Sequence, residues 1–361
     1  MLLGATPHNR ARAARNSAFR MAGLLSCSPS RPMLRTADYD YHLPEDLIAS
    51  RPAADRAASR MLVVHRATGR IEHRMFREFP SFLTNGDLLA LNDTKVVPAR
   101  VFSDDGRVEL LCLDRPAPQV WQCLVRPGKR MKPGRTVTVG GLTGTVEEVL
   151  ENGDRLIRWE TEPDLHRHGH LALPHYMNRP DDDADAERYQ TVFAREEGAI
   201  AAPTAGLHFT PEILSGLPHA FLTLHTGVGT FRPVSAETIT DHVMHSERFA
   251  ADADTVARIN AANRVIAVGT TVARVLETLK SDDPGTRIRP GSHRGETSIF
   301  IHPPQQISTV GGLLTNFHLP QSTLIMLVCA FAGRDLVLEA YRQAVAERYR
   351  FYSYGDCMLL L

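Results

Sequence analysis

The sequence predicts an α/β domain with a mixed sheet, interrupted by an inserted small antiparallel β-barrel. An apolar run leading directly into helix-forming sequence, as at 264–280, is typical of the α/β part. From residue 98 to 160 the pattern changes to short β-type runs separated by turn residues, which is typical of a barrel. Because α/β sequence resumes afterwards, we expect a discontinuous domain of residues 35–97 and 161–361, with the barrel at 98–160.

Composition sets broad limits on function. A chain of 361 residues with 43% hydrophobic and 23% charged residues is an ordinary globular protein, and its longest apolar run, 324–332, is too short to span a membrane. Its 41 basic residues balance 41 acidic ones, so a nucleic-acid partner would have to be bound by a local basic patch. Five cysteines without a Cys-x-x-Cys pair favour a reducing, cytoplasmic location and argue against structural zinc.

Residues 1–34 differ from the rest of the chain. They are rich in arginine, alanine and serine, and residues 1–37 hold six arginines and no acidic residue. We expect a disordered arm, or a start codon placed too early with Met33 as the true start. A transit-type segment is the alternative on composition.

The first α/β segment is expected to start near Ala37. A short helix is predicted at 43–46, because acidic residues there match the helix dipole. Strands are predicted at 61–65 and 86–91. The second strand ends in Asn92-Asp93-Thr94-Lys95, and polar groups at the carboxyl end of a strand lie where α/β sheets bind ligands.

The barrel is predicted from six short β-type runs. Asn152-Gly153 is a strong hairpin signal between the last two of them. The loop 126–135 contains five cations and no acid, which makes it a candidate for binding RNA phosphates, with a solvated loop as the alternative. The six runs are 99–102, 108–113, 120–125, 136–139, 143–150 and 155–159.

Two glycine-bearing loops lie in the second α/β segment, after a polar, loop-rich stretch at 161–198. The loop 202–208 leads into a helix with Thr210 as its expected N-cap and Pro211 at its first position. A buried strand at 220–224 then leads into the loop 225–230. Its Gly-x-Gly lacks the third glycine of a dinucleotide fingerprint, so a Rossmann site is not supported.

Further elements follow to the C-terminus. A strand at 264–268 runs into Gly269-Thr270-Thr271 and a helix, a junction that suits an anion or a ribose but is also common in ordinary capped helices. The remaining expectations are a short strand at 299–301, a strand near 311–315, an apolar helix from Ser322 or Thr323 to Gly333, an amphipathic helix at 335–349 and an aromatic, polar tail at 351–356.

Four histidines lie in predicted loops, where a general base or a hydrogen bond to a substrate would be placed: His208, His225, His245 and His318. Any one of them alone is more often structural than catalytic, but four in such loops favour function. No pair has metal-ligand spacing together with a third ligand, so we expect no metal.

Motifs distributed over most of the chain resemble one family. The motifs that carry the resemblance are DYDYHLPEDLIASRPAADRAASRMLV, LALNDTKVVPARV, LVRPGKRMKPG, APTAGLHFT, LHTGVGTFRPV, MHSERF, RVIAVGTTVARVLE, LLTNFHLPQSTLIMLVCAFAG and YRFYSYGDCMLL. With these motifs, the sequence from residue 37 onward resembles the S-adenosylmethionine:tRNA ribosyltransferase-isomerase family of queuosine biosynthesis. The resemblance also implies an α/β domain interrupted by a β-barrel.

The resemblance implies a specific reaction. The enzyme would move the ribosyl unit of S-adenosylmethionine onto 7-aminomethyl-7-deazaguanine at the tRNA wobble position and isomerise it, giving epoxyqueuosine and releasing adenine and methionine. S-adenosylmethionine would be a substrate, and no metal or redox cofactor would be required. The partners implied are tRNA and S-adenosylmethionine.

Site residues follow from matching the motifs to this chemistry. The expected catalytic residues are His208, His225 and His318. The expected substrate-binding residues are Thr226, Gly227, Gly229, Thr230, Thr270, Thr271 and Asn316, and the expected tRNA-binding residues are Arg126, Lys129 and Arg130. Asp93, Glu247 and Asp356 are further candidates to move protons, and the sequence assigns no individual role.

The chain departs from the family pattern near the predicted acceptor side. Gly295-Glu296-Thr297-Ser298 stands where the family shows Gly-Trp-Thr-Asp, and 303–306 replaces a Pro-Gly-Tyr-Arg turn. A paralogue that transfers ribosyl units to a different acceptor is therefore an alternative. A non-catalytic RNA-binding protein, suggested only by the basic loop, is another.

Overall fold

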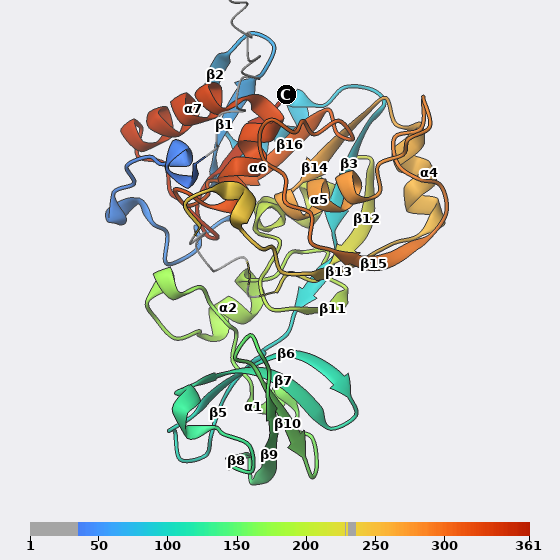
Figure 1. Ribbon diagram of the computed structural model, residues 1–361. Coiled ribbons are helices and arrows are strands. Elements are labelled where there is room, and N and C mark those ends of the chain that lie inside the picture. Colours follow the sequence, from blue (N-terminus) through green and yellow to red (C-terminus); the bar gives the residue numbers. More distant parts are fainter. Residues whose placement is uncertain (1–34, 228, 230–235) are drawn as a thin grey trace, which may run out of the picture. The chain divides into compact units, whose positions relative to one another are not determined.

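A large mixed sheet organises the chain (Figure 1). The computed structural model describes residues 35–227, 229 and 236–361, and within these ranges nine strands form this sheet in the order β15-β13-β12-β3-β14-β16-β17-β1-β2. The strands are β1 (Arg60–His65), β2 (Arg70–Met75), β3 (Asp87–Asn92), β12 (His219–Leu224), β13 (Glu247–Ala251), β14 (Arg264–Val268), β15 (His293–Thr297), β16 (Gly312–Asn316) and β17 (Cys357–Leu360). The expected mixed α/β character is confirmed.

Four neighbouring strands, β12, β3, β14 and β16, run parallel. Because all four point the same way, the residues that follow them meet at one edge of the sheet. Every residue of β3 and of β16 is buried, as expected for strands covered on both faces.

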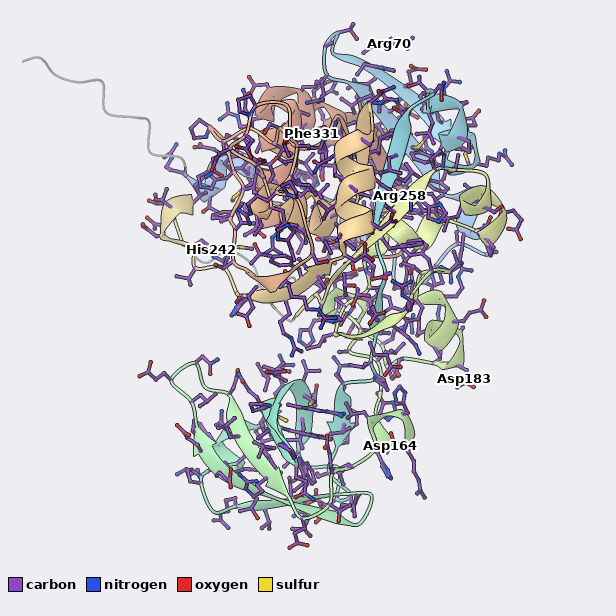
Figure 2. All side chains as sticks on the ribbon, turned by 90° about the vertical axis from the view of Figure 1, so that its right-hand side faces the viewer. Arg70, Asp164, Asp183, His242, Arg258 and Phe331 are labelled. Carbon is purple, nitrogen blue, oxygen red and sulfur yellow. The ribbon has the colours of Figure 1, made fainter. Side chains whose placement is uncertain are left out.

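Helices and aromatic side chains cover the two faces. One core cluster joins the sheet to helices α4 (Ala253–Ala261), α5 (Thr270–Thr278), α6 (Thr323–Ala332) and α7 (Arg334–Ala346). The other is built around Phe76, Phe79 and Phe209 and includes Leu214 of α3 (Pro211–Ser215). Figure 2 draws the side chains, with Arg258 marking α4 and Phe331 marking α6. The expected N-caps are present: Thr210 Oγ1 accepts the Ile213 N–H and Ser322 Oγ accepts the Ile325 N–H, each at 3.3 Å.

The six predicted short strands form a second, antiparallel sheet, ordered β5-β6-β7-β10-β9-β8. The Asp104 N–H, in the turn after the end strand β5, donates to the Thr138 carbonyl of the other end strand, β8, at 2.8 Å, so the sheet is nearly closed. Trp121 and Trp159 fill its core with ring centroids 4.9 Å apart. The strands are β5 (Arg100–Phe102), β6 (Glu109–Ala117), β7 (Val120–Arg126), β8 (Thr136–Val139), β9 (Leu142–Val149) and β10 (Arg155–Trp159).

Short elements connect these parts. β4 (Thr94–Val96) and β11 (Glu196–Ala199) form a small parallel sheet, and α1 (Leu165–His168) and α2 (Asp183–Arg188) are short helices. The 3-10 turns are η1 (Thr36–Tyr39), η2 (Glu45–Leu47), η3 (Arg56–Ala58), η4 (Phe76–Phe82), η5 (Gly128–Arg130), η6 (His175–Met177), η7 (Thr204–His208) and η9 (Ile239–Asp241).

One expectation for the C-terminal part needs correction. Residues 299–301 are not a strand: the Ile299 N–H donates to Thr297 Oγ1 and the Ile299 carbonyl accepts from Arg274 Nε, so side chains take the bonds that a neighbouring strand would need. The aromatic, polar tail expected at 351–356 packs into the protein. Beyond it, β17 lies between β16 and β1, and Phe351 and Tyr354 are buried.

Candidate functional site

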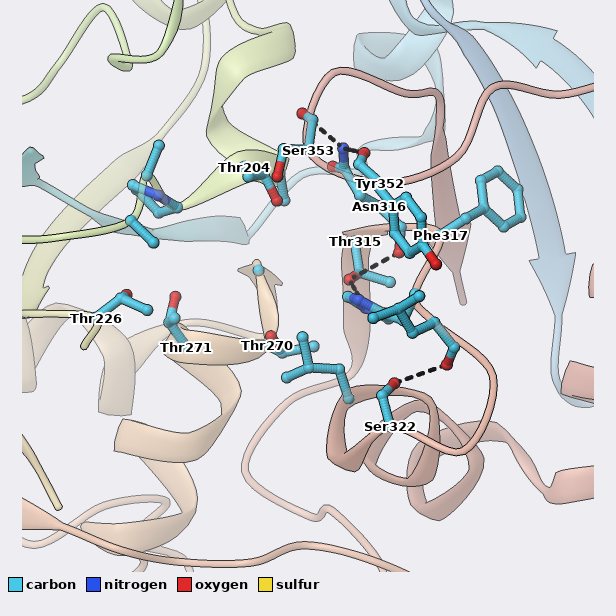
Figure 3. Close-up of a pocket in the computed structure, with 18 of the residues that line it drawn as sticks. Thr204, Thr226, Thr270, Thr271, Thr315, Asn316, Phe317, Ser322, Tyr352 and Ser353 are labelled. Atoms are coloured by element: carbon cyan, nitrogen blue, oxygen red, sulfur yellow. Dashed lines mark hydrogen bonds between the residues drawn. The ribbon is translucent and has the colours of Figure 1, made fainter. Parts of the chain in front are cut away.

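A pocket lies where β14 and β16 end (Figure 3). Thr226 and Thr271 are on one side of it in this view, and Thr315 and Asn316 on the other. Ligands of α/β sheets bind at such carboxyl ends. The lining residues are Tyr176, Tyr189, Ala201, Ala202, Pro203, Thr204, Ala205, Thr226, Gly269, Thr270, Thr271, Thr315, Asn316, Phe317, His318, Leu319, Ser322, Leu324, Tyr352 and Ser353.

The N-terminus of α5 forms part of the wall. Gly269 caps the helix with a φ of 98°, a conformation that glycine adopts without strain, and provides no side-chain cap. The first N–H groups of a helix have no partner within the helix, so those of α5 are available to a ligand oxygen. The Thr270 and Thr271 hydroxyls lie on this first turn, and Thr271 Oγ1 is 3.4 Å from Asn92 Nδ2. The predicted ribose-binding junction therefore lines the pocket.

Asn316 connects the pocket wall to His208. Its Nδ2 donates to the carbonyls of Tyr352 and Ser353 at 2.9 and 3.3 Å, and its Oδ1 is 3.1 Å from His208 Nε2. His208 Nδ1 is 2.9 Å from Ser59 Oγ. Both ring nitrogens are thus occupied by protein groups, and burial lowers the pKa of the His208 imidazole to about 4. His208 is not among the residues that line the pocket, so this geometry favours a positioning role over proton transfer.

His318 does line the pocket. Its Nε2 lies 2.7 Å from Thr315 Oγ1, and its backbone N–H donates to the Tyr341 hydroxyl at 3.0 Å. Burial lowers the pKa of His318 to about 3, so the ring is neutral at physiological pH. A neutral imidazole on the wall can donate or accept a hydrogen bond.

The loop after β12 borders a second hollow. His225, Thr226, Gly227 and Gly229 line it on the side of the large sheet, and Thr226 lines both hollows. His225 Nδ1 is 2.8 Å from Thr94 Oγ1, and burial, followed by the charge of Arg248, lowers the pKa of His225. A Cβ at Gly229 would lie 2.8 Å from the His245 ring, so a larger residue there would require the exposed His245 side chain to move. Thr230, also predicted to bind substrate, lies outside the described residues.

The three acidic candidates differ in their surroundings. Asp356 accepts the backbone N–H groups of Arg60 and Arg350, each at 2.8 Å, and so supports the tail. Asp93 accepts from Thr223 Oγ1 and from Arg195, both at 2.7 Å, and burial raises its pKa. Glu247 is buried, ion-paired with Arg274, and borders the second hollow. The first two do not line either hollow.

The predicted tRNA contacts lie at the end of β7 and in η5, and they do not line the pocket. Arg126, Lys129 and Arg130 are exposed. Arg126 Nη2 is 3.1 Å from His175 Nε2, and Arg130 Nη1 donates to the Arg107 carbonyl at 3.3 Å. Their guanidinium and ammonium groups remain open to a polyanion.

Several pocket residues were not predicted from the sequence. Tyr176 and Tyr352 stack with ring centroids 4.4 Å apart, and Ser353 and Thr204 complete the rim. The hydroxyls of Tyr189 and Thr226 are buried and find no hydrogen-bond partner among the described residues. Buried unpaired hydroxyls usually have a partner, which here would be a ligand or water. The aromatic, polar character of the tail was the one signal that could have indicated Tyr352 and Ser353.

The described residues hold neither a cluster of metal ligands nor a helix that could span a membrane. They contain no group of three or more histidine, cysteine, aspartate or glutamate side chains placed to hold a metal ion. Among the same residues, no helix combines the length and apolar character needed to cross a membrane.

Comparisons with known proteins give consistent results. A family model described as queuosine biosynthesis protein matches residues 36–360. Proteins named S-adenosylmethionine:tRNA ribosyltransferase-isomerase from Solibacter usitatus and Symbiobacterium thermophilum are 47% and 48% identical, each over 91% of this chain and 100% of the relative. The crystal structure of S-adenosylmethionine tRNA ribosyltransferase from Thermotoga maritima is similar at a TM-score of 0.51 and 37% identity, over 90% of this chain and 100% of that one.

Proposed function

The chain belongs to the queuosine biosynthesis protein family, and on this premise we propose that it is an S-adenosylmethionine:tRNA ribosyltransferase-isomerase. It transfers the ribosyl unit of S-adenosylmethionine to 7-aminomethyl-7-deazaguanine at the tRNA wobble position and isomerises it. The products are epoxyqueuosine in tRNA, adenine and methionine. S-adenosylmethionine is consumed as a substrate.

The chemistry of the pocket lining carries the proposal. The lining includes five threonines, two serines and Asn316 but no aspartate, glutamate, lysine or arginine among the described residues. Neutral hydroxyl and amide groups suit the oxygens of a ribose, and the Tyr176–Tyr352 stack offers an aromatic surface for a purine. The site thus fits the nucleoside part of S-adenosylmethionine better than a phosphate or a metal.

The reaction imposes three requirements. A base removes a proton from the carbon next to the sulfonium, an acid assists the departure of adenine, and donors hold the ribose oxygens during rearrangement. We assign the ribose oxygens to Thr226, Thr270 and Thr271. His225 and His318 are the candidates for proton transfer, because each has one ring nitrogen engaged by a threonine and lies at a hollow. His208 then positions Asn316.

The acceptor is a polyanion, which the basic loop suits. Arg126, Lys129 and Arg130 would contact tRNA phosphates from an inserted domain of residues 98–160, while residues 35–97 and 161–361 form the catalytic domain. We place the protein in the cytoplasm, where tRNA and S-adenosylmethionine are available.

Adenine release tests the proposal. The protein is incubated with S-adenosylmethionine and a tRNA carrying 7-aminomethyl-7-deazaguanine, and adenine and methionine are quantified by chromatography. We expect both in equal amounts, and neither with a tRNA that carries guanine at the wobble position. Absence of adenine with several deazaguanine-bearing tRNAs would contradict the proposal.

A second candidate function rests on Glu296. Its exposed carboxylate accepts from Ser246 Oγ at 2.7 Å, at a position where the family motif has tryptophan. A paralogue with another acceptor would bind S-adenosylmethionine in calorimetry yet leave the queuosine-precursor tRNA unmodified. A non-catalytic RNA-binding protein would show no affinity for S-adenosylmethionine.

A further inference from the structure

A buried ion pair connects the two loops to which the ribose is assigned. Glu247, the first residue of β13, pairs with Arg274 of α5, and the two side chains are only 6% and 7% exposed. Removing two charges from water is unfavourable unless their remaining donors and acceptors are also satisfied, and Arg274 Nη2 is buried without a hydrogen-bond partner among the described residues. A buried pair of this kind therefore suggests that the two segments it joins must be held at a defined spacing.

The glutamate end holds the loop that carries Thr226. Glu247 Oε1 accepts the Gly227 N–H at 3.0 Å, while Oε2 accepts from Arg274. On the other side of the loop, the Thr226 carbonyl accepts the Ile200 N–H at 2.9 Å. Thr226 is thus fixed from both directions, with its hydroxyl buried beside the pocket.

The arginine end holds α5. Arg274 is four residues after Thr270 and three after Thr271, so the three side chains share one face of the helix. Arg274 Nε also donates to the Ile299 carbonyl at 3.4 Å, which fixes the guanidinium to the segment after β15. One ion pair therefore joins the Thr226 loop to the helix turn that carries Thr270 and Thr271.

We propose that Glu247 and Arg274 form a positioning unit, which sets the spacing between Thr226 and the N-terminus of α5 that the donor ribose requires. This inference rests on the proposed function of the pocket. Both Glu247 oxygens are engaged by protein groups, so the carboxylate acts through Gly227 and Thr226 and does not transfer a proton.

The test combines Glu247→Gln, Arg274→Met and the double variant. We expect each single variant to raise KM for S-adenosylmethionine about tenfold, since tenfold corresponds to roughly 1.4 kcal/mol, the scale of a charge-assisted hydrogen bond. The double variant should have a KM for S-adenosylmethionine no higher than that of the more impaired single variant, because the effects of residues that act as one unit are not additive. Dissociation constants for S-adenosylmethionine from calorimetry should change in parallel with KM.

Asp87 and Arg264 provide a matched control. They form another ion pair, 2.5 Å long, at the opposite, amino-terminal ends of β3 and β14. Asp87→Asn and Arg264→Met should lower Tm but leave KM for S-adenosylmethionine unchanged. The inference is overturned if the Glu247 and Arg274 variants, like these controls, lower Tm and leave KM for S-adenosylmethionine unchanged. It is also overturned if their effects on KM multiply in the double variant.

Two further readouts keep the outcomes distinct. If Arg274→Met fails to fold, Arg274→Lys keeps the charge and loses the fork geometry, and it should give a folded protein with raised KM. If the parent protein releases no adenine but binds S-adenosylmethionine, the proposed function fails, whereas the positioning role is still tested by the dissociation constants.

Discussion

His208 Nε2 carries the proton in the hydrogen bond that joins it to Asn316. The Asn316 amide group donates to the carbonyls of Tyr352 and Ser353, so the atom that faces His208 at 3.1 Å is the oxygen Oδ1. An amide oxygen only accepts, so the imidazole must donate through Nε2 and accept from Ser59 Oγ through Nδ1. This fixes the tautomer of a buried histidine directly behind the pocket wall.

Asn316→Asp tests this network. The aspartate still accepts from His208, but its second oxygen faces two carbonyls and repels them. We expect the free energy of unfolding to fall by about 2 kcal/mol and KM for S-adenosylmethionine to rise, since a buried group is left without a partner. Denaturant titration and steady-state kinetics measure the two effects.

Asn260→Asp is the control for that substitution. Asn260 also bonds the backbone through both its oxygen and its amide nitrogen, in this case to Ile288, far from the pocket lining. The Asn260→Asp protein should be less stable than the parent protein but have the same KM for S-adenosylmethionine. A fully stable Asn316→Asp protein with normal KM would show that the assigned tautomer and network are wrong.

Buried histidines predict how stability depends on pH. Burial lowers the pKa of His208 to about 4 and that of His318 to about 3, both below the ordinary value of 6.5. Between those values the unfolded chain binds more protons than the folded chain, so stability is complete above about pH 6.5 and is lost as pH falls. We expect a loss of about 2 kcal/mol per histidine between pH 7 and pH 5.

Denaturant titrations at pH 7, 6 and 5 measure this dependence. His208→Gln removes one titrating group and should reduce the loss between pH 7 and pH 5, whereas His42→Gln, at an exposed position, should leave it as in the parent protein. An identical pH dependence in the His208→Gln protein would refute the assigned pKa.

The Thr270 hydroxyl is predicted to bind the donor. Thr270→Val keeps the shape of the side chain and removes one hydrogen-bonding group from the first turn of α5. We expect KM for S-adenosylmethionine to rise about three- to tenfold, the equivalent of one hydrogen bond. Thr255→Val removes a hydroxyl from the first turn of α4, where it bonds the Phe221 carbonyl, and should affect only stability. Equal KM values for the two variants would argue against the ribose assignment.

The sequence predicted most strands because their signals are local. An apolar run such as 264–268, bounded by turn residues, specifies a buried strand without knowledge of its neighbours. The strand β17 was missed because Cys357–Leu360 follows an aromatic tail at the chain end, and only its insertion between β16 and β1 shows its role. Likewise 299–301 is apolar enough for a strand, but Thr297 and Arg274 bond its backbone instead.

In the site, too, the features with a local sequence signal could be predicted, and those that depend on distant segments could not. Thr270 and Thr271 follow one strand and Asn316 ends another, so their position at the sheet edge could be inferred from the sequence alone. Tyr176 and Tyr189 reach the pocket from a loop-rich segment whose path depends on long-range packing. The protein partners of His208 also come from segments 149 and 108 residues away in sequence, so its two hydrogen bonds could not be predicted.

The basic loop is predicted to supply tRNA affinity. Replacing Arg126, Lys129 and Arg130 by glutamine should weaken tRNA binding and reduce the slope of log K against log salt by about 2 to 3, roughly one per phosphate contact. Calorimetry with S-adenosylmethionine should be unchanged. The control is a triple variant with the same change in charge, in which glutamine replaces three other exposed residues, Lys280, Arg334 and Arg342. An equal loss of tRNA affinity in that control would mean that net charge and not this loop binds tRNA.

The segment around Glu296 provides a test of the acceptor. Glu296 is exposed on β15, and the resemblance described above implies tryptophan at this position and aspartate at that of Ser298. An aromatic ring stacked on a base contributes about 1–3 kcal/mol, which neither replacement can supply. We therefore expect Glu296→Trp combined with Ser298→Asp to raise kcat/KM for deazaguanine-bearing tRNA by about fivefold to a hundredfold, with KM for S-adenosylmethionine unchanged. Glu296→Ala is the control: it removes the carboxylate and the hydrogen bond that this group accepts from Ser246, but it adds no aromatic ring. If kcat/KM for the tRNA falls in the double variant while the parent protein transfers ribosyl units efficiently, then Glu296 itself belongs to the acceptor site of this chain.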